Sequence, residues 1–163
     1  MRKRIAIFGG SLFQDIRVEK NSYILTGNNS VLNLKNAYNI DNYSVQGLTA
    51  ERALRLIKTL PIKEMYNDCI IALGENDIDC YYNFNKVLDE ILDYLLEANV
   101  RPILVSLSKE YLNKDKAHLI QKIIDNQAIE KNVDYIYEGE TEKTVSYIVK
   151  DNCNIEKAIL ALC

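Results

Sequence analysis

The sequence has 163 residues, of which 48% are hydrophobic, and its formal net charge at pH 7 is -3. This length and composition fit a single domain, residues 1–163, with a sizeable buried core. Positive and negative side chains are interspersed along the whole chain without a basic stripe, which argues against nucleic acid as a partner. No segment approaches the roughly 20 apolar residues that a membrane span requires.

The chain begins with MRKRIAIF, a short apolar run that glycines follow at once. This run is far shorter than the hydrophobic region of a secretory signal. The four cysteines, Cys69, Cys80, Cys153 and Cys163, show no CxxC spacing, and the chain contains one histidine. Such a set is poorly suited to zinc. We therefore expect a cytoplasmic protein with reduced thiols, without a bound metal and without a cofactor.

The first part of the chain predicts two strands and one helix. The apolar run from Arg4 to Phe8 is typical of a buried strand, and the more polar run from Asn36 to Val45 fits an edge strand. Before the second strand, the polar stretch from Thr26 to Asn36 predicts an irregular loop. Thr49 is suited to cap a helix that Pro61 would end, because proline lacks the N–H that a helix interior needs.

The rest of the chain alternates strands with helices. Apolar runs from Asp68 to Leu73, Pro102 to Leu107 and Val133 to Tyr137 predict three more strands. Apolar residues at helical spacing lie between them, from Phe84 to Leu96 and from Leu119 to Ala128. Strands separated by helices of this length pair in parallel through right-handed crossovers. The sequence thus predicts an α/β fold, a three-layer α/β/α sandwich around a parallel sheet of about five strands.

Three loops are expected to meet at the carboxyl edge of this sheet, where α/β proteins bind their ligands. They follow the first three predicted strands, at residues 9–11, 46–48 and 74–77. Ser11 in the first loop is a candidate nucleophile. The Gly47 N–H and the Asn76 side-chain amide are candidate donors to the oxyanion that develops during acyl transfer.

Each of these residues also has a simpler interpretation. Ser11 would serve as a helix cap or turn residue, Gly47 would only turn the chain, and Asn76 would cap a helix together with Asp77. The glycines before Ser11 could begin a dinucleotide-binding GxGxxG motif, but position 14 is glutamine. The opening is also similar to the GGSF stretch of nicotinate mononucleotide adenylyltransferases, but residues 12–19 lack that family's histidines.

Taken together, IFGGS with Ser11, VQGLT with Gly47 and LGENDI with Asn76 resemble the motifs of the SGNH hydrolases, also called GDSL-type lipases and acylhydrolases. The resemblance, in residue type, order and spacing, implies a flavodoxin-like fold over nearly the whole chain. It implies hydrolysis of a small-molecule carboxylic ester through an acyl-Ser11 intermediate. The oxyanion hole would consist of the Ser11 and Gly47 backbone N–H groups and the Asn76 amide.

Two positions depart from the pattern of that family. Gly10 stands where the family usually has aspartate, which removes a carboxylate next to the nucleophile. In place of the C-terminal DxxH block, Asp151 matches the acid but Asn154 stands where the histidine base is expected. An amide does not accept a proton at neutral pH, and a serine without an adjacent base is a weak nucleophile.

Two hypotheses from different classes follow: an ester hydrolase impaired by the missing base, and an inactive SGNH-fold binding or interaction protein. His118, the single histidine, is expected on a solvated helix face, and Cys153 is a poor general base. Asn154 would also suit the N-cap of a final helix from Ile155 to Leu162. The sequence leaves the acyl group, the alcohol and the oligomeric state open.

Overall fold

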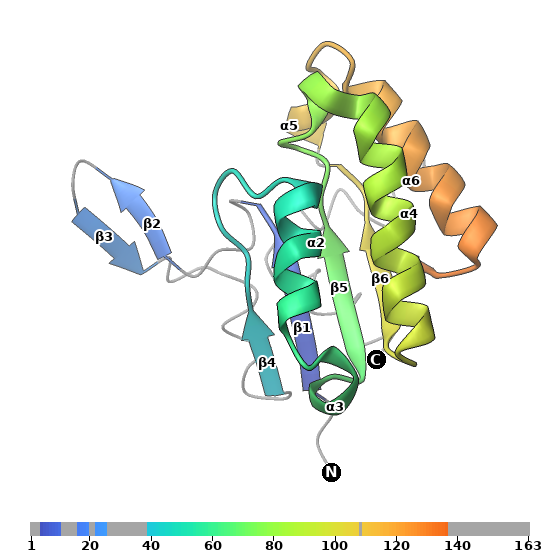
Figure 1. Cartoon of the computed structure of the whole chain (residues 1–163). Coiled ribbons are helices and arrows are strands. Elements are labelled where there is room, and N and C mark those ends of the chain that lie inside the picture. Colours follow the sequence, from blue (N-terminus) through green and yellow to red (C-terminus); the bar gives the residue numbers. More distant parts are fainter. Residues whose placement is uncertain (1–3, 11–15, 20–21, 26–38, 108, 137–163) are drawn as a thin grey trace.

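A computed structural model describes residues 4–10, 16–19, 22–25, 39–107 and 109–136. Its centre is a five-stranded parallel sheet with the strand order β4-β1-β5-β6-β7, of which Figure 1 labels β4, β1, β5 and β6. The strands are β1 (Arg4–Gly9), β4 (Asn39–Asn42), β5 (Asp68–Ala72), β6 (Arg101–Val105) and β7 (Asp134–Ile136). Each of the five falls on a run that the sequence predicts as a strand, so the predicted parallel sheet is confirmed.

Three long helices lie side by side on one face of the sheet (Figure 1). They are α2 (Ala50–Thr59), α4 (Tyr81–Glu97) and α6 (Ala117–Lys131), and α4 packs against both of the others. Shorter helical segments connect the main elements. These are α3 (Ile62–Met65), a 3-10 turn (Ile78–Cys80) and α5 (Lys109–Leu112). The three long helices confirm the predicted helical periods.

The first of these helices begins and ends where its sequence signals place it. The Thr49 side chain accepts a hydrogen bond from the Arg52 N–H at 3.3 Å, which satisfies one of the N–H groups that a helix start leaves without a partner. The helix ends at Thr59, two residues before Pro61. Its apolar side faces the core with Ala50, Ala53, Leu54 and Ile57.

Both faces of the central strands are buried. Phe8 and Ile71 point toward the long helices and belong to the main apolar core. The alternate residues Ile5, Ile7 and Ile70 face the other way and have no solvent exposure. Two covered faces are what a parallel α/β sheet requires. The predicted loop at residues 26–36 and the predicted final helix at residues 155–162 lie outside the described residues.

A small antiparallel hairpin stands apart from the main sheet (Figure 1). Its strands are β2 (Ile16–Glu19) and β3 (Ser22–Leu25), with Glu19 paired to Ser22. The sequence did not predict this hairpin. The two positions between the strands are Lys20 and Asn21, which lack the glycine that marks most two-residue hairpin turns.

The cysteines and the helix lengths bear on two of the sequence-based expectations, reduced thiols and the lack of a membrane span. Cys69 is a buried free thiol and Cys80 an exposed one, whereas Cys153 and Cys163 lie outside the described residues. Burial raises the pKa of the Cys69 thiol well above its ordinary value, so this side chain packs as a small apolar group. Among the described helices, none has the length and apolar character needed to cross a membrane.

Candidate functional site at the carboxyl edge of the sheet

The three predicted loops meet at the carboxyl edge of the sheet. The loop after β4 reaches the end of β1, where the Val45 N–H donates to the Gly9 carbonyl at 3.1 Å. The loop after β5 reaches the loop after β4, where the Asn76 side-chain amide donates to the Leu48 carbonyl at 3.1 Å. The end of β1 and the loop after β5 are in contact through Gly10 and the Glu75 side chain, as described below. The described parts of these loops, residues 9–10, 46–48 and 74–77, therefore converge, and the position of Ser11 stays a prediction.

The hydrogen bond from Asn76 fixes the direction of a side chain that is otherwise exposed. A primary amide carries two N–H donors, so the bond to Leu48 uses one and holds the other in a defined orientation. Leu48 directly follows Gly47, one of the predicted oxyanion donors. The amide of Asn76 and the backbone of Gly47 thus belong to one small cluster of polar groups.

The next residue, Asp77, attaches the same loop to the start of α2. Both of its carboxylate oxygens accept from the Ala50 N–H, at 3.1 and 3.2 Å. Burial raises the pKa of this carboxyl group to about 6, against the smaller opposite effect of the Ala50 hydrogen bond. Asp77 thus caps the start of α2 and makes no side-chain bond to the 3-10 turn that follows it.

Two glycines shape these loops for different reasons. Gly47 has a φ of +78°, which side-chain-bearing residues rarely adopt, although no atom lies within 4 Å of a Cβ built there. Gly74 has a φ of +117°, and a Cβ at this position would meet Ile120 Cγ2 at 2.7 Å. Gly74 therefore permits both the turn after β5 and the close packing of α6 against it.

Gly10 contacts the third loop because it has no side chain. A Cβ built on Gly10 would coincide with the carboxylate of Glu75, overlapping both Glu75 Oε1 and Glu75 Cδ. Gly10 is buried and Glu75 is half-buried. The aspartate that the family resemblance implies at position 10 is absent, and a carboxylate from the loop after β5 occupies that space.

A polar cavity of about 400 Å³ adjoins this cluster. It is lined by Glu75, Asn76, Ile78, Asp79, Lys114 and Asp115. The residues come from the loop after β5, from the 3-10 turn and from the segment before α6. Lys114 lies over the ring of Tyr111, with Nζ 4.4 Å from the ring centroid. The cavity gives Glu75 and Asn76 access to a small molecule.

The remaining predicted site residues are distributed as follows. His118 is exposed in the first turn of α6 and does not line the cavity, which agrees with its predicted place on a solvated helix face. Ser11, Asp151 and Asn154 lie outside the described residues, so their assigned roles stay predictions. Of the predicted oxyanion-hole residues, the structure describes Gly47 and Asn76, and Asn76 bonds to Leu48, the residue after Gly47.

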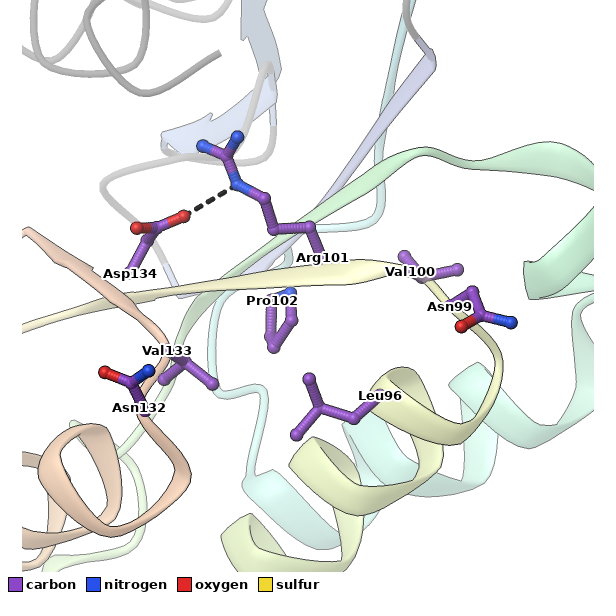
Figure 2. A pocket seen from close by; sticks show the side chains of 8 residues that line it. All are labelled: Leu96, Asn99, Val100, Arg101, Pro102, Asn132, Val133 and Asp134. Carbon is purple, nitrogen blue, oxygen red and sulfur yellow. Dashed lines mark ion pairs between the residues drawn. The ribbon is translucent and has the colours of Figure 1, made fainter.

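A second cavity of about 400 Å³ lies at the opposite, amino edge of the sheet (Figure 2). Its apolar wall consists of Leu96, Val100, Pro102 and Val133. The Arg101 guanidinium points to Asp134, with an Nε to Oδ2 distance of 2.7 Å, and lies 3.7 Å from the buried Asp68 carboxylate. These three charged residues begin β6, β7 and β5, so their attraction holds neighbouring strand starts together. We assign a structural role to this cluster.

Sequence reasoning missed two residues that position the carboxyl edge. Glu75 carried no recognisable signal, because its contact with Gly10 joins two separate loops. Gln121 is a buried polar residue on α6 whose side-chain oxygen accepts from the Leu107 N–H at 2.9 Å and whose amide donates to the Tyr135 hydroxyl at 2.7 Å. A glutamine within the apolar stripe of a helix was the available signal for the second residue.

Solved structures with a similar fold include several esterases. EstA, a psychrotrophic esterase from Pseudoalteromonas sp. solved with monoethylphosphonate as inhibitor, has a TM-score of 0.72 and 16% identity, covering 98% of this chain and 95% of that chain. TesA has a TM-score of 0.75 and 13% identity, covering 99% and 100%. AlinE4, described as an SGNH-hydrolase family esterase, has a TM-score of 0.66 and 20% identity, covering 99% and 93%.

Sequence comparison gives no comparable match. No family model matches the chain, and no curated protein matches it significantly. At identities of 20% or less, the similarity to these enzymes concerns the fold. The strand order, the carboxyl-edge loops and the coverage of nearly the whole chain agree with one another: this protein has the fold of the SGNH hydrolases.

Proposed function

We propose that this protein hydrolyses small carboxylic esters through a covalent acyl-Ser11 intermediate. The observation that supports it most directly is the Asn76 amide, which Leu48 holds beside Gly47 at the carboxyl edge of the sheet. The fold neighbours named as esterases support the same reaction class. A polar cavity next to Asn76 offers space for a small substrate.

In the proposed reaction, the Ser11 oxygen attacks the ester carbonyl carbon and gives up its proton. Negative charge develops on the carbonyl oxygen, where the Ser11 and Gly47 backbone N–H groups and the Asn76 amide would stabilise it. The tetrahedral intermediate collapses as the alcohol leaves with a proton. Water then attacks the acyl-enzyme, which releases the carboxylic acid and restores Ser11.

The C-terminal block is where this mechanism departs from its family. Asp151 would orient a histidine at position 154, but the residue there is asparagine. Loss of the histidine from a serine hydrolase, as in subtilisin, costs on the order of a million-fold in turnover. We therefore expect slow hydrolysis, sustained by the oxyanion donors and by whatever base serves Ser11.

The test is hydrolysis of p-nitrophenyl acetate and butyrate by the wild type and by Ser11→Ala. Wild-type turnover should exceed the uncatalysed rate, and Ser11→Ala should return it to that rate. The matched control is Ser106→Ala, because Ser106 also follows a strand, β6, and its hydroxyl donates to the Leu107 carbonyl. Activity that survives in Ser11→Ala would refute the nucleophile, and a folded wild type without any turnover would favour the binding-protein alternative.

A further inference from the structure

The end of β1 and the loop after β5 share one space, which a carboxylate fills. The Glu75 side chain lies where a side chain at position 10 would begin, and Gly10 has none. Any larger residue at position 10 would displace the carboxylate from this place. The glycine therefore admits Glu75 to the end of the strand that carries the proposed nucleophile.

Covalent geometry relates this carboxylate to Ser11. Ser11 directly follows Gly10, and consecutive Cα atoms are about 3.8 Å apart. A carboxylate in contact with Gly10 is therefore only a few ångströms from the Ser11 backbone. The Glu75 carboxylate is thus a proton acceptor in contact with the residue that directly precedes the proposed nucleophile. Glu75 also lines the cavity beside Asn76, so this acceptor borders the same space as a proposed oxyanion donor.

The other titratable groups described at this edge are less well placed. Both oxygens of Asp77 accept from the Ala50 N–H at the start of α2. His118 is exposed and does not line the cavity. Asp79 and Asp115 line the cavity, but of the described residues outside β1 it is Glu75 that lies against Gly10.

We propose that Glu75 is the general base of Ser11 and takes the part of the absent histidine; this inference rests on the ester hydrolysis proposed above. The Glu75 carboxylate accepts the hydroxyl proton as the Ser11 oxygen bonds to the ester carbon. The resulting carboxylic acid returns that proton to the alcohol as the carbon–oxygen bond breaks. In the second half, Glu75 takes a proton from water as water attacks the acyl group, and returns it to Ser11.

The experiment measures kcat/KM for p-nitrophenyl acetate between pH 3.5 and 8 in the wild type, Ser11→Ala, Glu75→Gln and Glu75→Asp. A general base contributes about 10²- to 10⁴-fold, so Glu75→Gln should lose at least about a hundredfold. Wild-type activity should rise with pH as the base loses its proton. Glu75→Gln should lack that rise, and Glu75→Asp should recover part of the activity.

A second pair of variants covers the case in which Glu75→Gln fails to fold. Gly10→Ala places a Cβ where the carboxylate lies, so it should lower kcat/KM as Glu75→Gln does. If both changes act through one carboxylate, the double variant should be no slower than the slower single variant. The matched control, Glu97→Gln on the exposed end of α4, should keep wild-type kinetics.

The outcomes separate this inference from the proposed function. Hydrolysis that requires Ser11 but is unchanged in Glu75→Gln would overturn Glu75 as the base and leave the esterase proposal standing. If the losses in kcat/KM from Gly10→Ala and Glu75→Gln add up in the double variant, the assignment of Glu75 as the general base would also be wrong. A wild type without Ser11-dependent hydrolysis at any pH would overturn both.

Discussion

The two edges of the sheet use polar side chains in different ways. At the amino edge, side chains pair with one another: Arg4 Nη2 lies 3.1 Å from Asp41 Oδ2, and the Tyr66 hydroxyl donates to the same oxygen at 2.7 Å. Burial and the hydrogen bonds to Tyr43 and Asp41 raise the pKa of Tyr66 far above its usual value, so it remains a donor. The Arg4 and Asp41 charges face each other, Tyr66 donates to Asp41, and these contacts hold the strand starts together.

At the carboxyl edge, the same kinds of side chain bond to the backbone of another loop. Asn76 donates to the Leu48 carbonyl, and Asp77 accepts from the Ala50 N–H. These bonds hold loops and a helix start in place, and they orient an amide beside Gly47. The comparison suggests that substitutions at the amino edge reduce stability, whereas substitutions at the carboxyl edge reduce activity.

The largest expected effect is on activity, from Asn76→Ala. Removal of one oxyanion donor typically lowers kcat by about 10²- to 10³-fold. The cost in stability should be only about 1 kcal/mol, because Asn76 is exposed and makes one neutral hydrogen bond to Leu48. Ester hydrolysis and urea unfolding measured on the same preparation would check both figures. A variant with wild-type kcat would remove Asn76 from the oxyanion hole.

Arg101→Met should produce the opposite result, a loss of stability without a loss of turnover. It removes the guanidinium that faces Asp68, whose side chain is only 3% exposed. Taking one partner from a buried ion pair costs about 3 kcal/mol. Urea unfolding gives the stability, and the folded variant should keep the wild-type kcat.

The control for this substitution is Arg55→Met. Arg55 pairs with Glu51 on the surface of α2, where the two side chains are 73% and 55% exposed. The free energy of unfolding should fall by less than about 1 kcal/mol in this variant, because water and salt screen an exposed ion pair. Equal losses at the two positions would show that the amino-edge cluster has no special structural role.

A change in stability that depends on pH is expected from Asp77→Asn. Burial raises the folded-state pKa of Asp77 to about 6, whereas the unfolded chain titrates near 3.9. Between about pH 4 and pH 6 the folded protein therefore binds more protons than the unfolded chain. The contribution of Asp77 to the free energy of unfolding is complete below about pH 4 and is lost as the pH rises through 6. Asparagine keeps an oxygen acceptor for the Ala50 N–H without a charge.

The free energy of unfolding of Asp77→Asn, relative to that of the wild type, should therefore increase by on the order of 2 to 3 kcal/mol between pH 4 and pH 7. The measurement is the free energy of unfolding of both proteins at each pH. Because the other carboxyl groups are common to both proteins, their contributions cancel in the difference. A difference that does not change with pH would contradict the raised pKa.

The sequence predicted the fold well because its signals are local. A continuous apolar run predicted β1, helical spacing predicted α4 and α6, and Thr49 and Pro61 predicted the limits of α2. The hairpin of β2 and β3 was missed because its turn carries no glycine. Turn chemistry is read from two or three residues, so one missing residue removes the signal.

For the site, the sequence by itself determined which residue types stand at the strand ends, because that follows from chain order in a parallel sheet. It indicated Gly47 and Asn76 in this way. Only the tertiary structure decided which groups touch: Asn76 bonds to a carbonyl 28 residues away, and Glu75 fills the space that Gly10 leaves empty. Such contacts depend on the packing of loops from different strands, and spacing along the chain does not encode the distance between them.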